Sequence, residues 1–228
     1  MGGYYIGIHF KAGDGAAITD AVTQTFTDAG FKPLSDEPAS VVVTDEDQLP
    51  GGDRWYGVLI SGETKGGWVS VYVDDWADSG LLAKSVSQRL GIPTLEAWVA
   101  DDVHWGCTYY ESGEVQDRFA DDPAQVAESA EEAKLYAGNA DALAAILCVP
   151  PASLAKAFTD AHAKAGQFAG GPLGDLAEAV GLPFEHVFTG YDYFFSDDPE
   201  DYSQDLENWP TFRHLAFQMP KNRETLAE

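Results

Sequence analysis

The chain has 228 residues, of which 45% are hydrophobic and 12% aromatic. This composition is sufficient for the core of one large or two small domains, and it excludes a chain that is disordered throughout. The chain holds 38 acidic and 13 basic residues, and its formal net charge is -25. Binding to a nucleic-acid backbone or to an anionic membrane is therefore excluded as its main role, because both need clustered Lys and Arg.

The first 40 residues predict a strand followed by a helix. Tyr4–Phe10 alternates apolar and polar positions, as a half-buried strand does. Asp14 stands at the N-cap position of a helix that ends at Gly30. Glycine followed by an apolar residue recurs at Gly91 and Gly181, with proline next, so we expect two further helices to end there.

The following segments predict more strands and one more helix. A helix is expected over about Ser79–Leu90, and strands are expected at Val41–Val43, Trp55–Ile60, Trp68–Asp74, Leu95–Ala100, Trp105–Tyr110 and Val115–Phe119. The order strand–helix–glycine–strand thus occurs twice, at Tyr4–Val43 and at Trp68–Ala100. We therefore expect two related units that share one mostly antiparallel sheet.

The pattern becomes helical from Pro123 onward. Helices are expected at Val126–Ala137, at Asp141–Leu147, from Ser153 to His162 and at Leu176–Val180. The predicted fold class is α+β, a mostly antiparallel sheet built from two strand–helix–strand units and covered by C-terminal helices. Residues 1–122 form the sheet unit, and residues 123–228 form a helical and acidic-aromatic segment that packs on it in one compact domain.

One group of acidic residues predicts a metal site at the ends of strands. Strand ends of one sheet can converge, and carboxylate oxygens bind divalent cations. The candidate ligands are Asp74, Asp75, Asp101, Asp102 and His104. Aspartates at strand ends also form turns, which is the alternative. His104 and Cys107 are a candidate thiolate–imidazole pair, against the alternative that Cys107 is a core thiol.

Aromatic residues on the predicted strands suggest a second candidate site. We expect one sheet face, opposite the valines of Trp68–Asp74, to carry Trp68, Tyr72, Glu96, Trp98, Thr108, Tyr110 and Arg118. Aromatic rings with a few polar groups are typical of a ligand pocket. The candidate binding residues are Trp68, Tyr72, Trp98, Tyr110 and Arg118. The alternative is that C-terminal helices cover this face as ordinary core.

Familiar nucleotide-binding motifs are incomplete in this chain. Gly13-Asp14-Gly15 precedes a helix, but Asp14 would repel a pyrophosphate. Residues 170–174 are rich in glycine and are followed by no lysine, which excludes a P-loop. No cofactor is expected.

Residues 68–123 resemble a group of uncharacterised bacterial proteins. The resemblance lies in an aspartate pair and a hairpin, formed by Asp101, Asp102, Tyr110, Gly113, Asp117, Phe119 and Pro123. The resemblance implies one α+β unit in this part of the chain and transfers no activity.

The acidity favours a non-enzymatic, protein-binding module for a basic partner. In general character such a protein resembles the immunity proteins that neutralise basic bacterial toxins. A hydrolase or small-ligand-binding protein with its site between sheet and helices is the alternative, and adaptation to high salt is a third. No apolar run is long enough for a membrane span and no signal peptide is apparent, so we expect a cytoplasmic protein. Carboxylate repulsion alone predicts greater stability near pH 5–6 than near pH 8.

Overall fold

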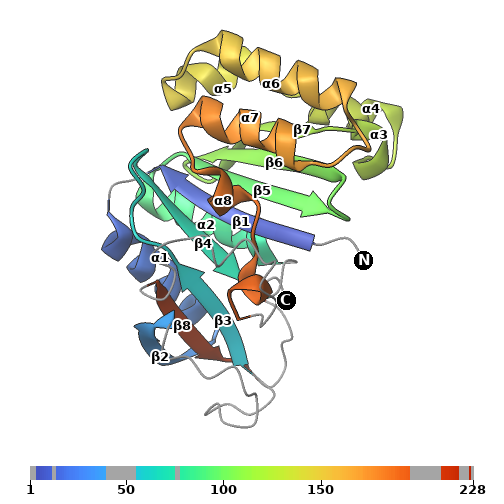
Figure 1. Ribbon diagram of the computed structural model, residues 1–228. Helices are drawn as coiled ribbons and strands as arrows, with labels where there is room; N and C mark the ends of the chain where they lie inside the picture. The colour runs from blue at the N-terminus through green and yellow to red at the C-terminus, as the bar shows by residue number, and fades with distance from the viewer. Residues whose placement is uncertain are drawn as a thin grey trace.

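The computed structural model describes residues 4–11, 14–39, 55–74, 78–195, 212–220 and 226. The strands of these ranges form one open sheet in the order β2-β8-β3-β4-β1-β5-β6-β7, and every pairing is antiparallel (Figure 1). They are β1 (Tyr4–Lys11), β2 (Lys32–Pro38), β3 (Trp55–Ile60), β4 (Trp68–Val73), β5 (Thr94–Ala100), β6 (His104–Glu111), β7 (Glu114–Ala120) and β8 (Arg213–Gln218). The predicted α+β class with an antiparallel sheet is confirmed.

Helices cover both faces of the sheet. Two of them, α1 (Gly15–Asp28) and α2 (Ser79–Leu90), lie on one face. The C-terminal helices lie at the other face and at the β7 edge (Figure 1). These are α3 (Pro123–Val126), α4 (Ala130–Ala133), the 3-10 turn η4 (Lys134–Tyr136), α5 (Ala140–Leu147), α6 (Pro151–Ala163), α7 (Gly170–Val180), α8 (Phe184–Val187) and the 3-10 turn η5 (Tyr191–Phe195).

The alternation of each strand divides the core into two layers. On the face toward α1 and α2, hereafter the α1–α2 face, Ile8 and Val71 pack against Phe26 and Leu82. On the opposite face, hereafter the α5–α7 face, apolar strand residues pack against the C-terminal helices, as at Leu95 and Phe119 with Phe158 and Leu173. Each such large apolar side chain stabilises the folded state by about 1.5–3 kcal/mol when it is fully buried.

The predicted helix boundaries at the glycines are confirmed. The Asp14 carboxylate accepts hydrogen bonds from two amides of the first turn of α1, which satisfies donors that the helix itself leaves open. Gly30, Gly91 and Gly181 have φ of 90°, 65° and 73°, a left-handed conformation that glycine adopts without a Cβ penalty.

The strand after α1 differs from the prediction. It is β2, and it pairs with β8 next to β3. Lys32–Pro38 has no apolar alternation and contains two prolines, which sheets tolerate mainly at edges, so the sequence pattern gave no strand signal. The predicted strand Val41–Val43 lies outside the described residues.

Several residues of the hairpin of β6 and β7 have structural roles. Gly113 has φ of 83° in the connecting turn. The Asp117 carboxylate accepts a 2.7 Å hydrogen bond from the Asn139 amide, just before α5. The Phe119 ring stacks on Phe158 of α6 with 4.3 Å between centroids. These residues therefore join the hairpin to the C-terminal helices.

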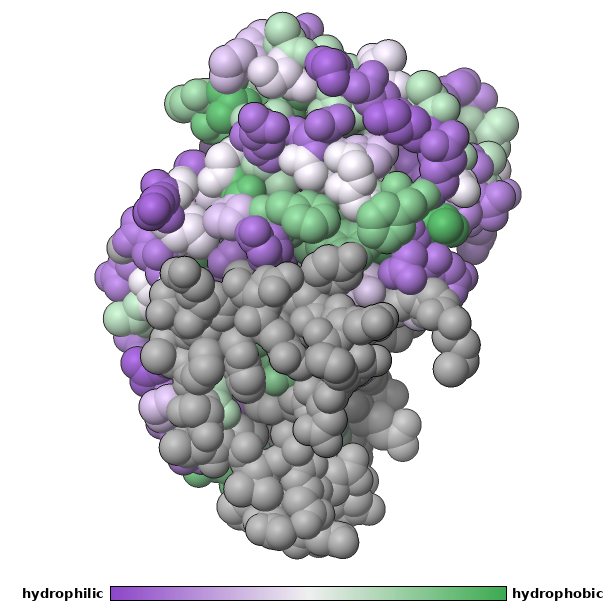
Figure 2. Space-filling model, viewed as in Figure 1, coloured by the Kyte–Doolittle hydropathy of each residue, from purple (hydrophilic) through white to green (hydrophobic). Residues whose placement is uncertain are grey.

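The surface on the side shown in Figure 1 is uneven in polarity. The outer surfaces of the upper helices are mostly hydrophilic, and apolar side chains gather across the middle of the view (Figure 2). Phe168, just before α7, is 56% exposed and its ring lies 5.5 Å from that of the buried Phe188. Within the described ranges, no helix has both the length and the hydropathy needed to cross a bilayer.

Candidate functional site

A cavity of about 880 Å³ lies at one end of β1. It lies around Tyr4, Tyr5 and Ile6 of β1, beyond the point where the pairing of β1 with β4 stops. Its lining residues are Tyr4, Tyr5, Ile6, Val73, Asp74, Ser79, Gly80, Glu96, Trp98, Val99, Ala100, Thr108, Val126, Tyr136, Gly190, Tyr191 and Asp192. We call it the Trp98 cavity. Its volume is in the range of about 300–1,000 Å³ that is usual for ligand sites.

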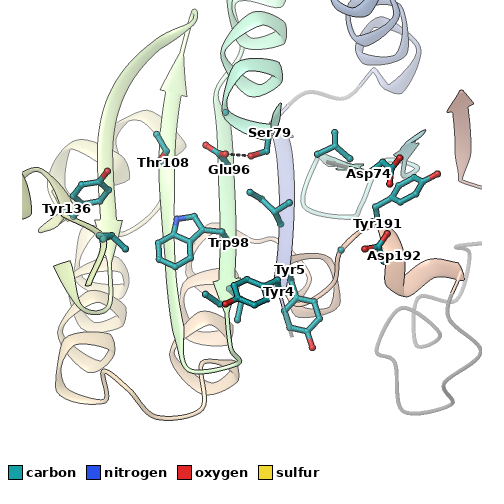
Figure 3. A pocket seen from close by; sticks show the side chains of 17 residues that line it. Tyr4, Tyr5, Asp74, Ser79, Glu96, Trp98, Thr108, Tyr136, Tyr191 and Asp192 are labelled. Carbon is teal, nitrogen blue, oxygen red and sulfur yellow. Dashed lines mark hydrogen bonds between the residues drawn. The ribbon is translucent and has the colours of Figure 1, made fainter. Parts of the chain in front are cut away.

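The cavity has two lobes, one on each side of β1 (Figure 3). The Glu96 lobe contains Glu96, Trp98, Thr108 and Tyr136, from β5, β6 and η4. The Asp192 lobe contains Asp74, Tyr191 and Asp192, from the end of β4 and from η5. Segments that are more than 100 residues apart in the chain thus share one cavity.

Hydrogen bonds fix the carboxylate at the base of the Glu96 lobe. The Ser79 hydroxyl, at the first residue of α2, donates to Glu96 Oε1 at 2.5 Å. The Tyr110 hydroxyl donates to Oε2 at 2.9 Å. Glu96 is only 8% exposed, and the two hydroxyls satisfy its oxygens without bringing a positive charge. Burial, with Glu96 as the next cause, raises the pKa of Tyr110, so its hydroxyl stays protonated and can donate.

Aromatic rings form the walls of the same lobe. Trp98 lies two residues after Glu96 on β5, so both side chains are on the α1–α2 face, and the indole is partly exposed. Gly106, opposite Trp98 on β6, leaves room for the indole, because a Cβ there would lie 2.4 Å from the ring. Tyr136 completes the wall, and the Arg118 guanidinium lies over its ring, 5.9 Å from the centroid.

The Asp192 lobe combines two carboxylates with a buried phenol. Burial, with Asp74 and then Asp192 as further causes, raises the pKa of Tyr191 well above its usual value. The Tyr191 hydroxyl lies 2.6 Å from His214 Nε2. The pKa of Asp192 is also raised, because surrounding protein atoms reduce the hydration of its carboxylate. The lobe is therefore acidic.

The residues that line the cavity carry negative charge only. Asp74, Glu96 and Asp192 supply three carboxylates, whereas no Lys, Arg or His is among the described lining residues. Aromatic rings attract cations through their negative faces, and carboxylates do so through their charge. The arrangement is thus suited to a positively charged group.

The predicted metal cluster is not formed by its described members. Within the described ranges, no group of three or more His, Cys, Asp or Glu residues is arranged to hold a metal ion. Asp75 lies outside those ranges. Asp101 and Asp102 have φ of 53° and 60° between β5 and β6, and the Val103 amide donates to the Ala100 carbonyl at 3.2 Å, so the aspartates form a tight hairpin turn.

The other candidate ligands also have separate surroundings. The Tyr4 hydroxyl donates to Asp101 at 3.3 Å, and Asp101 is the main cause of a raised pKa of Tyr4. His104 Nδ1 lies 3.6 Å from a carboxylate oxygen of Asp121. Asp74 lies at the Trp98 cavity instead.

The alternative pair of His104 and Cys107 is also wrong. The two residues are three positions apart on β6, so their side chains point to opposite faces of the sheet. Burial raises the pKa of the Cys107 thiol, which keeps it protonated in the core of the α5–α7 face.

The predicted shared aromatic face is wrong as well, because of strand register. Ile8 lies opposite both Val71 and Glu96, and residues directly opposite each other share a face. The β5–β7 members of the set therefore lie on the α1–α2 face with the valines, whereas Trp68 and Tyr72 lie on the α5–α7 face. A displacement of one residue exchanges the two faces, and the sequence did not define that register.

The five candidate binding residues consequently have different environments. Of the five, only Trp98 lines the cavity, and the Tyr110 hydroxyl donates a hydrogen bond to Glu96. Trp68 is fully buried, and its indole donates to the Val180 carbonyl at 3.1 Å. Tyr72 is buried with its hydroxyl on the His186 carbonyl at 3.1 Å. Arg118 lies beside the cavity, over Tyr136.

Sequence analysis missed a group of three buried histidines on the α5–α7 face. His9 Nδ1 lies 2.9 Å from the Ser70 hydroxyl, and His186 Nδ1 lies 3.0 Å from the Tyr72 hydroxyl. His214 Nε2 lies 2.6 Å from the Tyr191 hydroxyl. The three histidines are far apart in the sequence and follow no motif, so only the fold brings them to one layer. Comparisons with protein-family profiles, with curated proteins and with solved structures find no match to this chain.

Proposed function

We propose that the protein is a non-enzymatic binding module for a basic protein, and that the Trp98 cavity receives positively charged side chains of that partner. The observation that carries the proposal is the lining of the cavity, where aromatic rings and the carboxylates of Asp74, Glu96 and Asp192 meet without a basic residue among the described lining. The net charge of -25 would steer a basic partner toward the molecule and speed their encounter.

A ten-residue lysine peptide provides a defined probe for this proposal. We expect saturable binding at 150 mM NaCl, measured by calorimetry and by tryptophan fluorescence. A variant with Asp74→Asn, Glu96→Gln and Asp192→Asn should bind at least about tenfold more weakly, which corresponds to about 1.4 kcal/mol.

A matched variant separates the cavity from general acidity. Glu37→Gln, Asp141→Asn and Glu178→Gln remove the same number of charges at exposed positions outside the cavity lining. This control should retain most of the affinity. Equal losses in the two variants would show that the peptide responds only to net charge, and no binding by the wild type would exclude the proposal. Strong stabilisation by molar KCl without peptide binding would instead favour salt adaptation.

Binding of a small ligand in the same cavity is the second candidate function. The observation that favours it is the concave shape and the volume of about 880 Å³, which suits a small molecule. Thermal melting with a panel of cationic, neutral and anionic small molecules tests it. Stabilisation by an uncharged compound that the Trp98→Ala substitution abolishes would favour this candidate over the basic protein.

A further inference from the structure

The Glu96 lobe contains a buried carboxylate without a basic partner. Glu96 is 8% exposed, and within the described residues no Lys, Arg or His lies at ion-pair distance from it. A buried charge is costly unless an opposite charge or several donors compensate it. Ser79 and Tyr110 supply two hydroxyl donors but leave the charge uncompensated. With Trp98 on the same face of β5, the lobe offers one ammonium group both a carboxylate and an aromatic surface.

The Asp192 lobe offers a second site of the same sign. Asp74 and Asp192 line this lobe beside Tyr191 (Figure 3). Two carboxylates that line one lobe attract a cation through their charge. The lobe therefore has the properties of a second ammonium site.

Apolar side chains lie between the lobes. Ile6, partly exposed on β1, lines the cavity between them, and Val73 lines it at the end of β4. An apolar connection between two acidic lobes matches a ligand whose charges are separated by methylene groups. Resting on the function proposed above, we propose that the Trp98 cavity binds two ammonium groups joined by an aliphatic stretch, one at Glu96 and Trp98 and the other at Asp74 and Asp192.

Two sources share this chemistry, a free aliphatic polyamine and neighbouring lysine side chains of a basic protein. Calorimetry with α,ω-diaminoalkanes of three to eight carbons tests the chemistry, with a monoamine and an uncharged diol of equal length as controls. We expect affinity to peak at one chain length. The best diamine should bind at least about tenfold more tightly than the matched monoamine, and the diol should not bind.

Two single substitutions assign the lobes. Glu96→Gln should weaken the monoamine and the diamine alike, because both use the Glu96 lobe. Asp192→Asn should reduce the diamine toward the affinity of the monoamine and weaken the monoamine much less. Glu178→Gln, at an exposed position on α7, is the matched control and should change neither. If Glu96→Gln fails to fold in a cooperative melt, the response to Asp192→Asn still decides the inference.

The outcomes separate this inference from the proposed function. Equal affinity for monoamine and diamine, or equal effects of Asp192→Asn on both, would overturn the two-lobe site. Binding of the lysine peptide without binding of any diamine would also overturn it and leave the proposed function standing. If neither cationic probe binds, both proposals fail. Tighter binding of a diamine than of the lysine peptide would support the inference with a free polyamine as the source.

Discussion

The buried histidines predict that acid destabilises the folded protein. His9, His186 and His214 are 0%, 7% and 1% exposed. Burial lowers the pKa of His9 to about 3, with a further contribution from His186. Burial also lowers the pKa of His186 and of His214 to about 4. All three histidines are therefore neutral in the native state at pH 5, whereas in the unfolded chain they titrate near their usual pKa of 6.5.

The change in the free energy of unfolding with pH follows from the number of protons that each state binds. Between about pH 6.5 and pH 4 the unfolded chain binds more protons than the native state, so the free energy of unfolding falls as the pH falls. A histidine with a pKa of about 4 in the native state and 6.5 in the unfolded chain lowers the free energy of unfolding by about 2 kcal/mol at pH 5 relative to pH 8. The three histidines together lower it by about 6 kcal/mol. This is comparable to the whole stability of many domains, about 5–15 kcal/mol.

Two effects act in the opposite direction. The pKa values of Asp117 and Asp192 are raised, chiefly by burial, so these carboxyls bind protons more readily in the native state. Repulsion among the surface carboxylates also favours lower pH, but salt screens it strongly, because the Debye length at 0.5 M is only about 4–5 Å. The desolvation of three buried histidines should therefore dominate at that salt concentration.

Urea unfolding at pH 5, 6, 7 and 8 in 0.5 M NaCl, followed by tryptophan fluorescence and far-UV circular dichroism, measures the effect. We expect the free energy of unfolding to fall by several kcal/mol from pH 8 to pH 5. His186→Gln should reduce that fall by about 2 kcal/mol. His162→Gln, at an exposed histidine outside this group, is the matched control. An equal or higher free energy of unfolding at pH 5 would refute the reasoning, as would identical pH slopes for wild type and His186→Gln.

Three further predictions concern the cavity and its support. Arg118→Gln removes the cation beside the Glu96 lobe and should raise the affinity for monoamines about two- to fivefold in calorimetry, whereas Arg118→Lys should not. Tyr110→Phe removes one donor to Glu96 and should lower the free energy of unfolding by about 1–3 kcal/mol in urea. Gly106→Ala places a Cβ 2.5 Å from the Phe119 carbonyl oxygen, so we expect a loss of about 1–3 kcal/mol and a shifted tryptophan emission; an unchanged melting temperature would contradict this packing.

The local elements of the fold were largely accessible from the sequence. Alternation identified β1, and glycines in the left-handed conformation ended α2 and α7 as expected. These signals depend on residues close together in the chain, and the backbone preferences of glycine act without tertiary context. The edge strand β2 escaped detection, because its pairing with β8 and not an apolar pattern makes it a strand.

The candidate site depended on relations that only the tertiary structure decides. Trp98 was identified as a binding candidate, but it was grouped with Trp68, which lies on the opposite face. Side chains alternate with a period of two, so the face of a residue depends on register with a partner strand far away in the sequence. Tyr191 and Asp192 reach the cavity because η5 packs beside β1, where Gly190 lies close to the backbone of Tyr5. No local sequence pattern encodes that approach. The sequence by itself thus determined the acidity, the class of fold and most helix ends, whereas long-range packing determined which carboxylates and rings face one another.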